Sequence, residues 1–169
     1  MNAAQIHLAF NHLPMAFAIV GVPLLAYALW KKSKELKNVG VLLVVLAGVC
    51  SVPTFLSGEP AEELVEDKVG ISKSVIHEHE EAGEAFFILS AVLSVLALGA
   101  WLFEKFKAPL PTPLWTSLVV LGSVGLILFA RTAHLGGLIH HEELGQGTVT
   151  VGSEAAHESS GDDEGEDRD

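Results

Sequence analysis

The stretch NVGVLLVVLAGVCSVPTFLSG, residues 38–58, contains no Asp, Glu, Lys or Arg in 21 positions. Three further stretches share this property, and they cover residues 1–30, 85–103 and 108–130. A helix needs about 20 apolar residues to cross the hydrocarbon core of a bilayer. The sequence therefore predicts an all-α integral membrane protein, a four-helix bundle whose spans cover roughly residues 5–30, 38–56, 78–103 and 112–141.

Composition excludes several classes of protein. The 169 residues are 50% hydrophobic, yet the formal net charge is −11. The confinement of charge between the apolar stretches argues against a soluble enzyme, and the acidic balance argues against nucleic acid as a partner. The single cysteine, Cys50, excludes an intrachain disulfide, a Cys-rich zinc site and a Cys-x-x-Cys-His haem attachment.

The distribution of charge predicts the orientation. Six of the ten basic residues lie in two short loops on one side of the predicted bundle, at Lys31, Lys32, Lys34, Lys37, Lys105 and Lys107. By the positive-inside rule this side is cytoplasmic, and three tryptophans fall at the same interface, namely Trp30, Trp101 and Trp115. We therefore expect a multi-pass protein of the bacterial cytoplasmic membrane with both termini on the outer, periplasmic side.

Two parts are expected along the chain. Residues 1–146 form the four-span domain, and residues 147–169 form a disordered acidic tail, because their composition buries too little apolar surface to fold. The sequence contains no Gly-x-Ser-x-Gly, no His-Glu-x-x-His and no phosphate-binding loop. Whether the protein is an enzyme stays open, and a stand-alone enzyme is the less favoured interpretation.

All eight histidines lie in the outer half of the predicted spans or beyond them, at His7, His12, His77, His79, His134, His140, His141 and His157. Depth follows from counting about 1.5 Å per residue from the inner tryptophans. His12 and His134 then lie at nearly equal depth, about 27 and 28 Å from the level of the inner tryptophans. His7 and His79 lie about 34 and 33 Å from that level. Imidazoles from three spans are therefore expected to meet near the outer surface.

Three hypotheses follow for these histidines. A b-type haem needs imidazoles on facing helices and no cysteine, and it would serve electron transfer, with His12 and His134 as candidate ligands. A non-haem iron, copper or zinc ion would suit a mixture of imidazoles with carboxylates such as Glu59 and Glu80. In the third hypothesis the protein is a cofactor-free structural or interaction subunit, and the histidines pair with acids or titrate.

Two charged residues are predicted to lie deep in the membrane. Arg131 falls about 24 Å and Glu84 about 26 Å above the inner tryptophans. Charges at such depth usually face the bundle interior in pairs. The sequence therefore predicts an ion pair between Glu84 and Arg131, or between Arg131 and another acid nearby.

Short ordered motifs over about residues 5–145 resemble a bacterial membrane family, domain-of-unknown-function family 2231. His7 and the run from His12 to Pro14 are similar to its opening His-Pro-x-x-x-His-Phe-Pro box, with Leu8 and Leu13 replacing Pro and Phe. The chain especially resembles a branch of this family with Asn-His-x-Pro, Gly-Glu-Pro-Ala-Glu-Glu, Glu-His-Glu-Glu-Ala and Gly-Gly-x-Ile-x-His motifs. In this sequence these motifs are Asn11 to Pro14, Gly58 to Glu63, Glu78 to Ala82, and Gly136 to His141.

This resemblance implies a four-helix membrane domain, sometimes found beside cytochrome-like modules, and no settled activity. It moves the expected ligands toward His7, His12, His79 and His141, because His134 lies outside the motifs. His134 stays a candidate because of its depth, so the candidate haem ligands are His7, His12, His79, His134 and His141. The candidate metal ligands are His7, His12, His79, His141, Glu59 and Glu80. The expected partners are the lipid bilayer and respiratory-chain or cytochrome subunits.

Overall fold

The computed structural model describes residues 2–63 and 73–140. These residues form five helices and no strand, in the order α1 (Ala3–Phe10), α2 (His12–Lys31), α3 (Lys34–Glu63), α4 (Lys73–Phe106) and α5 (Thr112–His140). The all-α prediction is thus confirmed. The predicted tail and His141 lie outside the described residues.

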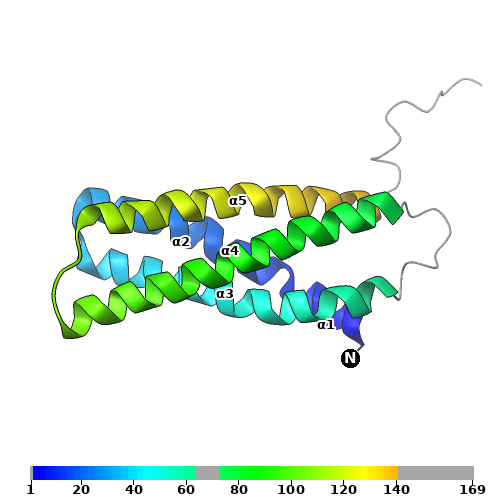
Figure 1. Ribbon diagram of the computed structural model, residues 1–169, viewed down its shortest axis with the longest axis horizontal. Helices are drawn as coiled ribbons and strands as arrows, with labels where there is room; N and C mark the ends of the chain where they lie inside the picture. Colours follow the sequence, from blue (N-terminus) through cyan, green and yellow to red (C-terminus); the bar gives the residue numbers. More distant parts are fainter. Residues whose placement is uncertain (1, 64–72, 141–169) are drawn as a thin grey trace, which may run out of the picture.

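Four segments are long and apolar enough to cross a membrane, and they cover Ala3–Lys31, Lys34–Ala61, Lys73–Phe106 and Thr112–Leu138. Figure 1 shows them as an elongated bundle of helices running side by side. In it α2 packs on α3, α3 on α4, α4 on α5 and α5 back on α2, so the four long helices form a closed ring. The prediction of a four-helix bundle with apolar spans is therefore confirmed.

The first span is interrupted at Asn11, which separates α1 from α2. Pro14 follows within one turn, and its missing N–H removes a hydrogen bond from the helical ladder. Beyond this break α1 packs on α3 and touches α2, but no Cα of α1 lies within 8 Å of a described Cα of α4 or α5. At this end of the bundle, α1 therefore takes the place of α2, and its backbone lies close to α3 rather than to α4 or α5.

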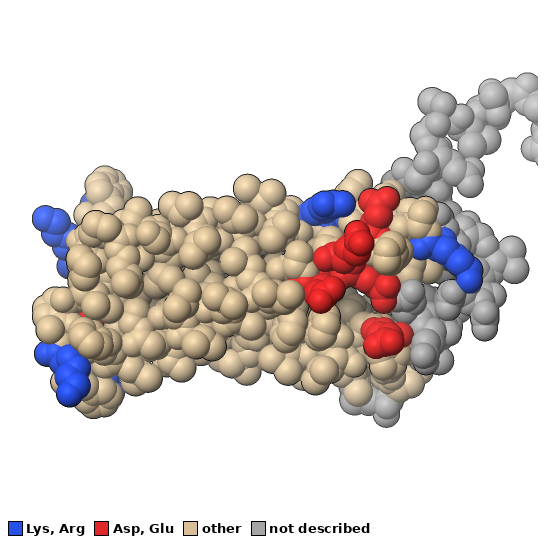
Figure 2. Space-filling model, viewed as in Figure 1, with Lys and Arg blue, Asp and Glu red and all other residues tan. Residues whose placement is uncertain are grey.

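Charge is divided between the two ends of the bundle. In Figure 2 lysines lie at one end, and most of the acidic side chains in view gather toward the other, where basic residues also occur. We call the end with the loop between α2 and α3 the lysine end, and the opposite end, which carries His7 and His79, the histidine end.

The interior of the lysine half is apolar. Its core contains Leu25 of α2, Val41 of α3, Ala97 of α4 and Trp115 of α5, each no more than 3% exposed. Trp115 was expected at the membrane interface, but its ring is buried inside the bundle. Its indole Nε1–H donates to Glu104 Oε1 at 2.8 Å, which gives this buried polar atom a partner.

Hydroxyl groups line the seam between α3 and α4 in the middle of the bundle. The buried serines of this seam are Ser51, Ser90 and Ser94, whereas buried Ser57 of α3 lies beside His7 of α1. Ser90 Oγ donates to Ser51 Oγ at 3.1 Å, and Ser94 Oγ donates to the Val45 carbonyl at 3.0 Å. The two helices approach closely because Gly48 of α3 faces Ser94 without a side chain between them.

Candidate functional site

His7 is anchored on α3 through one of its ring nitrogens. Nδ1 lies 3.0 Å from the carbonyl oxygen of Thr54 and 3.4 Å from Ser57 Oγ. A carbonyl oxygen only accepts hydrogen bonds, so Nδ1 must carry the hydrogen and donate it. In the neutral imidazole, Nε2 is then left with its lone pair free to bind a ligand or a metal.

His79 is anchored in the same way on α5. Its Nδ1 donates to the carbonyl oxygen of Thr132 at 2.9 Å, so the lone pair again resides on Nε2. The ring lies against Gly136, where an added Cβ would be 3.0 Å from His79 Cε1. A side chain at position 136 would therefore press on the ring and require it to shift.

The two anchored imidazoles belong to one region of the histidine end. His7 and His79 are both half-buried. They come from α1 and α4, and among the described residues no Cα of α1 lies within 8 Å of a Cα of α4. A histidine that binds a metal typically donates its other ring N–H to a carbonyl or carboxylate, which fixes the tautomer and the orientation. Both rings show this arrangement.

The structure leaves the other described candidates at the surface. His12 and His134 are exposed on α2 and α5, so their equal depth does not bring them into the interior. Glu59 and Glu80 are also exposed, and Glu80 approaches His77 rather than His79, at 3.9 Å. Within the described part of the chain, no group of three or more His, Cys, Asp or Glu side chains is arranged to hold a metal. The six-residue metal set is therefore not assembled by the residues described.

Arg131 pairs with Glu78 in the structure and not with Glu84, its first predicted partner. The ion pair in the structure joins Arg131 Nη2 to Glu78 Oε2 at 3.9 Å, with both side chains more than half exposed. Glu78 and Glu84 are six residues apart on α4 and therefore project from different faces of the helix. The alternative of a nearby acid describes this pair, which lies on the surface rather than inside the bundle.

Asn11 is a polar residue of this region that was not among the predicted site residues. Its Oδ1 is shielded from solvent and has no hydrogen-bond partner among the described residues. The signal was present in the sequence, because Asn11 lies four residues after His7 and opens the Asn-His-x-Pro motif.

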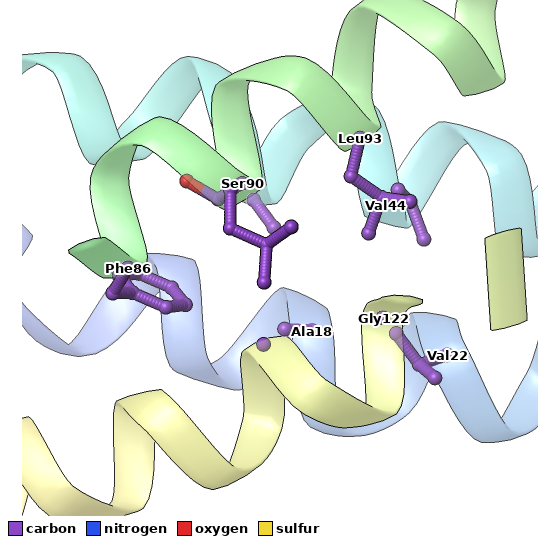
Figure 3. A pocket seen from close by; sticks show the side chains of 10 residues that line it. Ala18, Val22, Val44, Phe86, Ser90, Leu93 and Gly122 are labelled. Carbon is purple, nitrogen blue, oxygen red and sulfur yellow. The ribbon is translucent and has the colours of Figure 1, made fainter. Parts of the chain in front are cut away.

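A small pocket in the middle of the bundle does not add to the site. It is lined by residues of all four long helices, including Ala18, Val44, Phe86 and Gly122 (Figure 3). No titratable side chain lines it, and the hydroxyl of Ser90 is already bonded to Ser51. We interpret this pocket as loose packing around small residues.

Comparisons of the chain with models of protein families, with curated proteins and with solved structures find no match. The function must therefore be argued from the residues of this chain. Four of the positions in its sequence motifs meet in pairs, since His7 packs on Gly58 and His79 packs on Gly136.

Proposed function

We propose that this protein binds a metal centre through His7 and His79 and serves electron transfer at the membrane. The observation that carries the proposal is the matched anchoring of the two rings, each through Nδ1 on a backbone carbonyl of a neighbouring helix. This arrangement holds both Nε2 lone pairs ready for coordination, with no reorganisation of the tautomer.

The first form of the proposal is a b-type haem. Two imidazoles from different helices could hold such a haem, and no cysteine is needed. When bound, the haem iron would supply one-electron chemistry, while His7 and His79 hold it and fix its orientation. Arg131, at the same end of the bundle, offers a cation for a propionate.

The second form is a single non-haem ion of iron, copper or zinc. Imidazole nitrogens suit all three metals, but an ion needs more than two donors unless it is copper(I). The buried and unpartnered oxygen of Asn11 favours this form, because it adds an oxygen donor one helical turn from His7.

The proposed location follows from the charges. Lysines cluster at the lysine end, so the positive-inside rule assigns this end to the cytoplasm of a bacterial cell. The histidine end then faces the periplasm. A centre there suits a small subunit of a respiratory assembly, which agrees with the family that the motifs resemble.

The test is a reduced-minus-oxidised optical spectrum of the full chain purified in detergent, with elemental analysis of the same sample. We expect haem bands on reduction, or about one metal ion per chain, with complete loss in His7→Ala and in His79→Ala. His77→Ala is the matched control, because His77 is exposed on the same helix as His79 and should leave binding unchanged. Equal binding by the wild type and both variants would contradict the proposal.

Gly136→Ala should weaken binding without removing a ligand. The added Cβ would press on the His79 ring at 3.0 Å, so the ring must shift. Displacing a ligand from its supporting contacts costs about 10- to 100-fold in metal affinity. Gly58→Ala is the control, since its Cβ would lie 3.8 Å from His7 Cε1, an ordinary contact. Titration of the same metal into both variants compares them, and equal affinities would count against the role of Gly136.

A further inference from the structure

We infer that Asn11 is a third donor of this site and that its side-chain oxygen binds the metal ion held by His7 and His79. The inference rests on the proposed function in its non-haem form. Bis-imidazole haem iron leaves no axial position for a third protein donor. The site would then offer two nitrogens and one oxygen to a first-row divalent ion.

The side chain of Asn11 has no partner in the local backbone. An asparagine before a helix usually accepts a hydrogen bond from the second or third N–H of that helix. Asn11 precedes α2 but makes no such bond, because its own backbone is helical, with φ −58° and ψ −26°. The third helical residue is Pro14, which has no N–H to offer. Local structure therefore leaves Oδ1 without a donor.

The position of Asn11 relates it to His7. The two residues are four apart, and the Asn11 N–H donates to the His7 carbonyl at 2.8 Å, so the helical turn between them is intact. Residues four apart in a helix project from the same face. Asn11 therefore shares the face of α1 from which His7 extends, one turn closer to the middle of the membrane.

Burial makes the unpartnered oxygen informative. A buried carbonyl without a hydrogen bond destabilises the protein, and native structures contain few of them. In a membrane span there is no bulk water to supply the missing partner. A cation can bind such an oxygen directly. In membrane transporters, ions are coordinated in this way by the carbonyl oxygens of unwound helix segments.

Copper(II) is the probe that tests the inference. Divalent copper has the highest affinity in the first-row series for nitrogen and oxygen donors, and its electron paramagnetic resonance spectrum reports the donor atoms. We would titrate copper(II) into the metal-free full chain in detergent. Asn11→Leu should weaken binding by about 10- to 100-fold, and Asn11→Asp should at least preserve it, because a carboxylate keeps the oxygen and adds charge. His77→Ala should bind as the wild type does.

A stability measurement separates a ligand from a structural residue. Without metal, Asn11→Leu removes an unpartnered buried oxygen, so its thermal stability should equal or exceed that of the wild type. If Asn11→Leu instead lowers the metal-free stability and leaves copper affinity unchanged, the inference is overturned.

The remaining outcomes separate the inference from the proposed function. If His7→Ala and His79→Ala lose copper while both Asn11 variants keep it, only the inference fails. If the purified protein carries haem whose bands do not change in Asn11→Leu, the inference also fails and the metal centre stands. If no histidine variant changes binding, the proposed function itself fails.

Discussion

Replacing Glu104 with alanine should destabilise the bundle by about 3 kcal/mol, because its carboxylate joins three helices at the lysine end. Oε2 accepts a hydrogen bond from Lys37 Nζ of α3. Oε1 accepts from the Leu110 N–H at 3.0 Å and from the Trp115 indole at 2.8 Å. Alanine would leave an ammonium group, an indole and a backbone N–H without their acceptor in a largely buried place.

Unfolding of the purified protein in mild detergent, by heat or by added dodecyl sulfate, measures this effect. Trp115 fluorescence should change in the same variant, because the indole loses its hydrogen bond. Glu104→Gln should be less damaging, since the amide oxygen still serves Trp115 and Leu110. Glu35→Ala is the control, because Glu35 is an exposed acid at the same end and is bonded to Ser33. Equal losses in Glu35→Ala and Glu104→Ala would refute the role of Glu104.

Gly48→Ala should destabilise the bundle by about 2 kcal/mol or more, because it overpacks the seam between α3 and α4. The new Cβ would collide with the Cβ of Ser94 and lie 2.9 Å from the Ser90 carbonyl oxygen. Backbone and Cβ atoms cannot rotate away, so the two helices would have to separate. The hydrogen bonds from Ser90 to Ser51 and from Ser94 to Val45 would then be strained.

Gly99→Ala on α4 is the matched control for this prediction. Apart from the adjoining residues and the local helix backbone, no atom of the described residues lies within 4 Å of the Cβ that this change adds. Alanine favours the helix over glycine by about 1 kcal/mol, so this variant should be as stable as the wild type or more stable. If Gly48→Ala proves as stable as Gly99→Ala in the same unfolding assay, the close approach at Gly48 is not required.

The membrane spans could be predicted from the sequence because they depend only on where charged residues are missing. Their ends could not be predicted as well. The third expected span begins at about residue 78, but α4 begins at Lys73, and α3 continues to Glu63. Helical hydrogen bonds do not require an apolar neighbourhood, so helices extend into the polar turns. The break at Asn11 also lies upstream of Pro14, the residue that predicted a bend.

The candidate site was predicted only in part, because depth along a helix is independent of rotation about its axis. Counting residues placed His12 and His134 at one level, but both turn away from the interior. His7 and His79 were among the candidates, and their anchoring on Thr54 and Thr132 depends on which helices become neighbours. The contact between Lys37 and Glu104, which are 67 residues apart, also depends on which helices become neighbours, so it was not predicted.

The hydroxyl-lined seam between α3 and α4 has an electrical consequence. The serines of this seam extend toward the lysine end only as far as Ser94, and beyond it apolar side chains surround Leu25 and the Trp115 ring. Most of the membrane voltage therefore falls across the apolar half, where a charge would gain or lose about 2.3 kcal/mol per 100 mV on crossing the full field. In the proposed function, a cation that enters from the histidine end would reach His7 and His79 before crossing that half. If the proposed site holds an ion there, its occupancy should follow the concentration of that ion outside the histidine end and hardly respond to voltage.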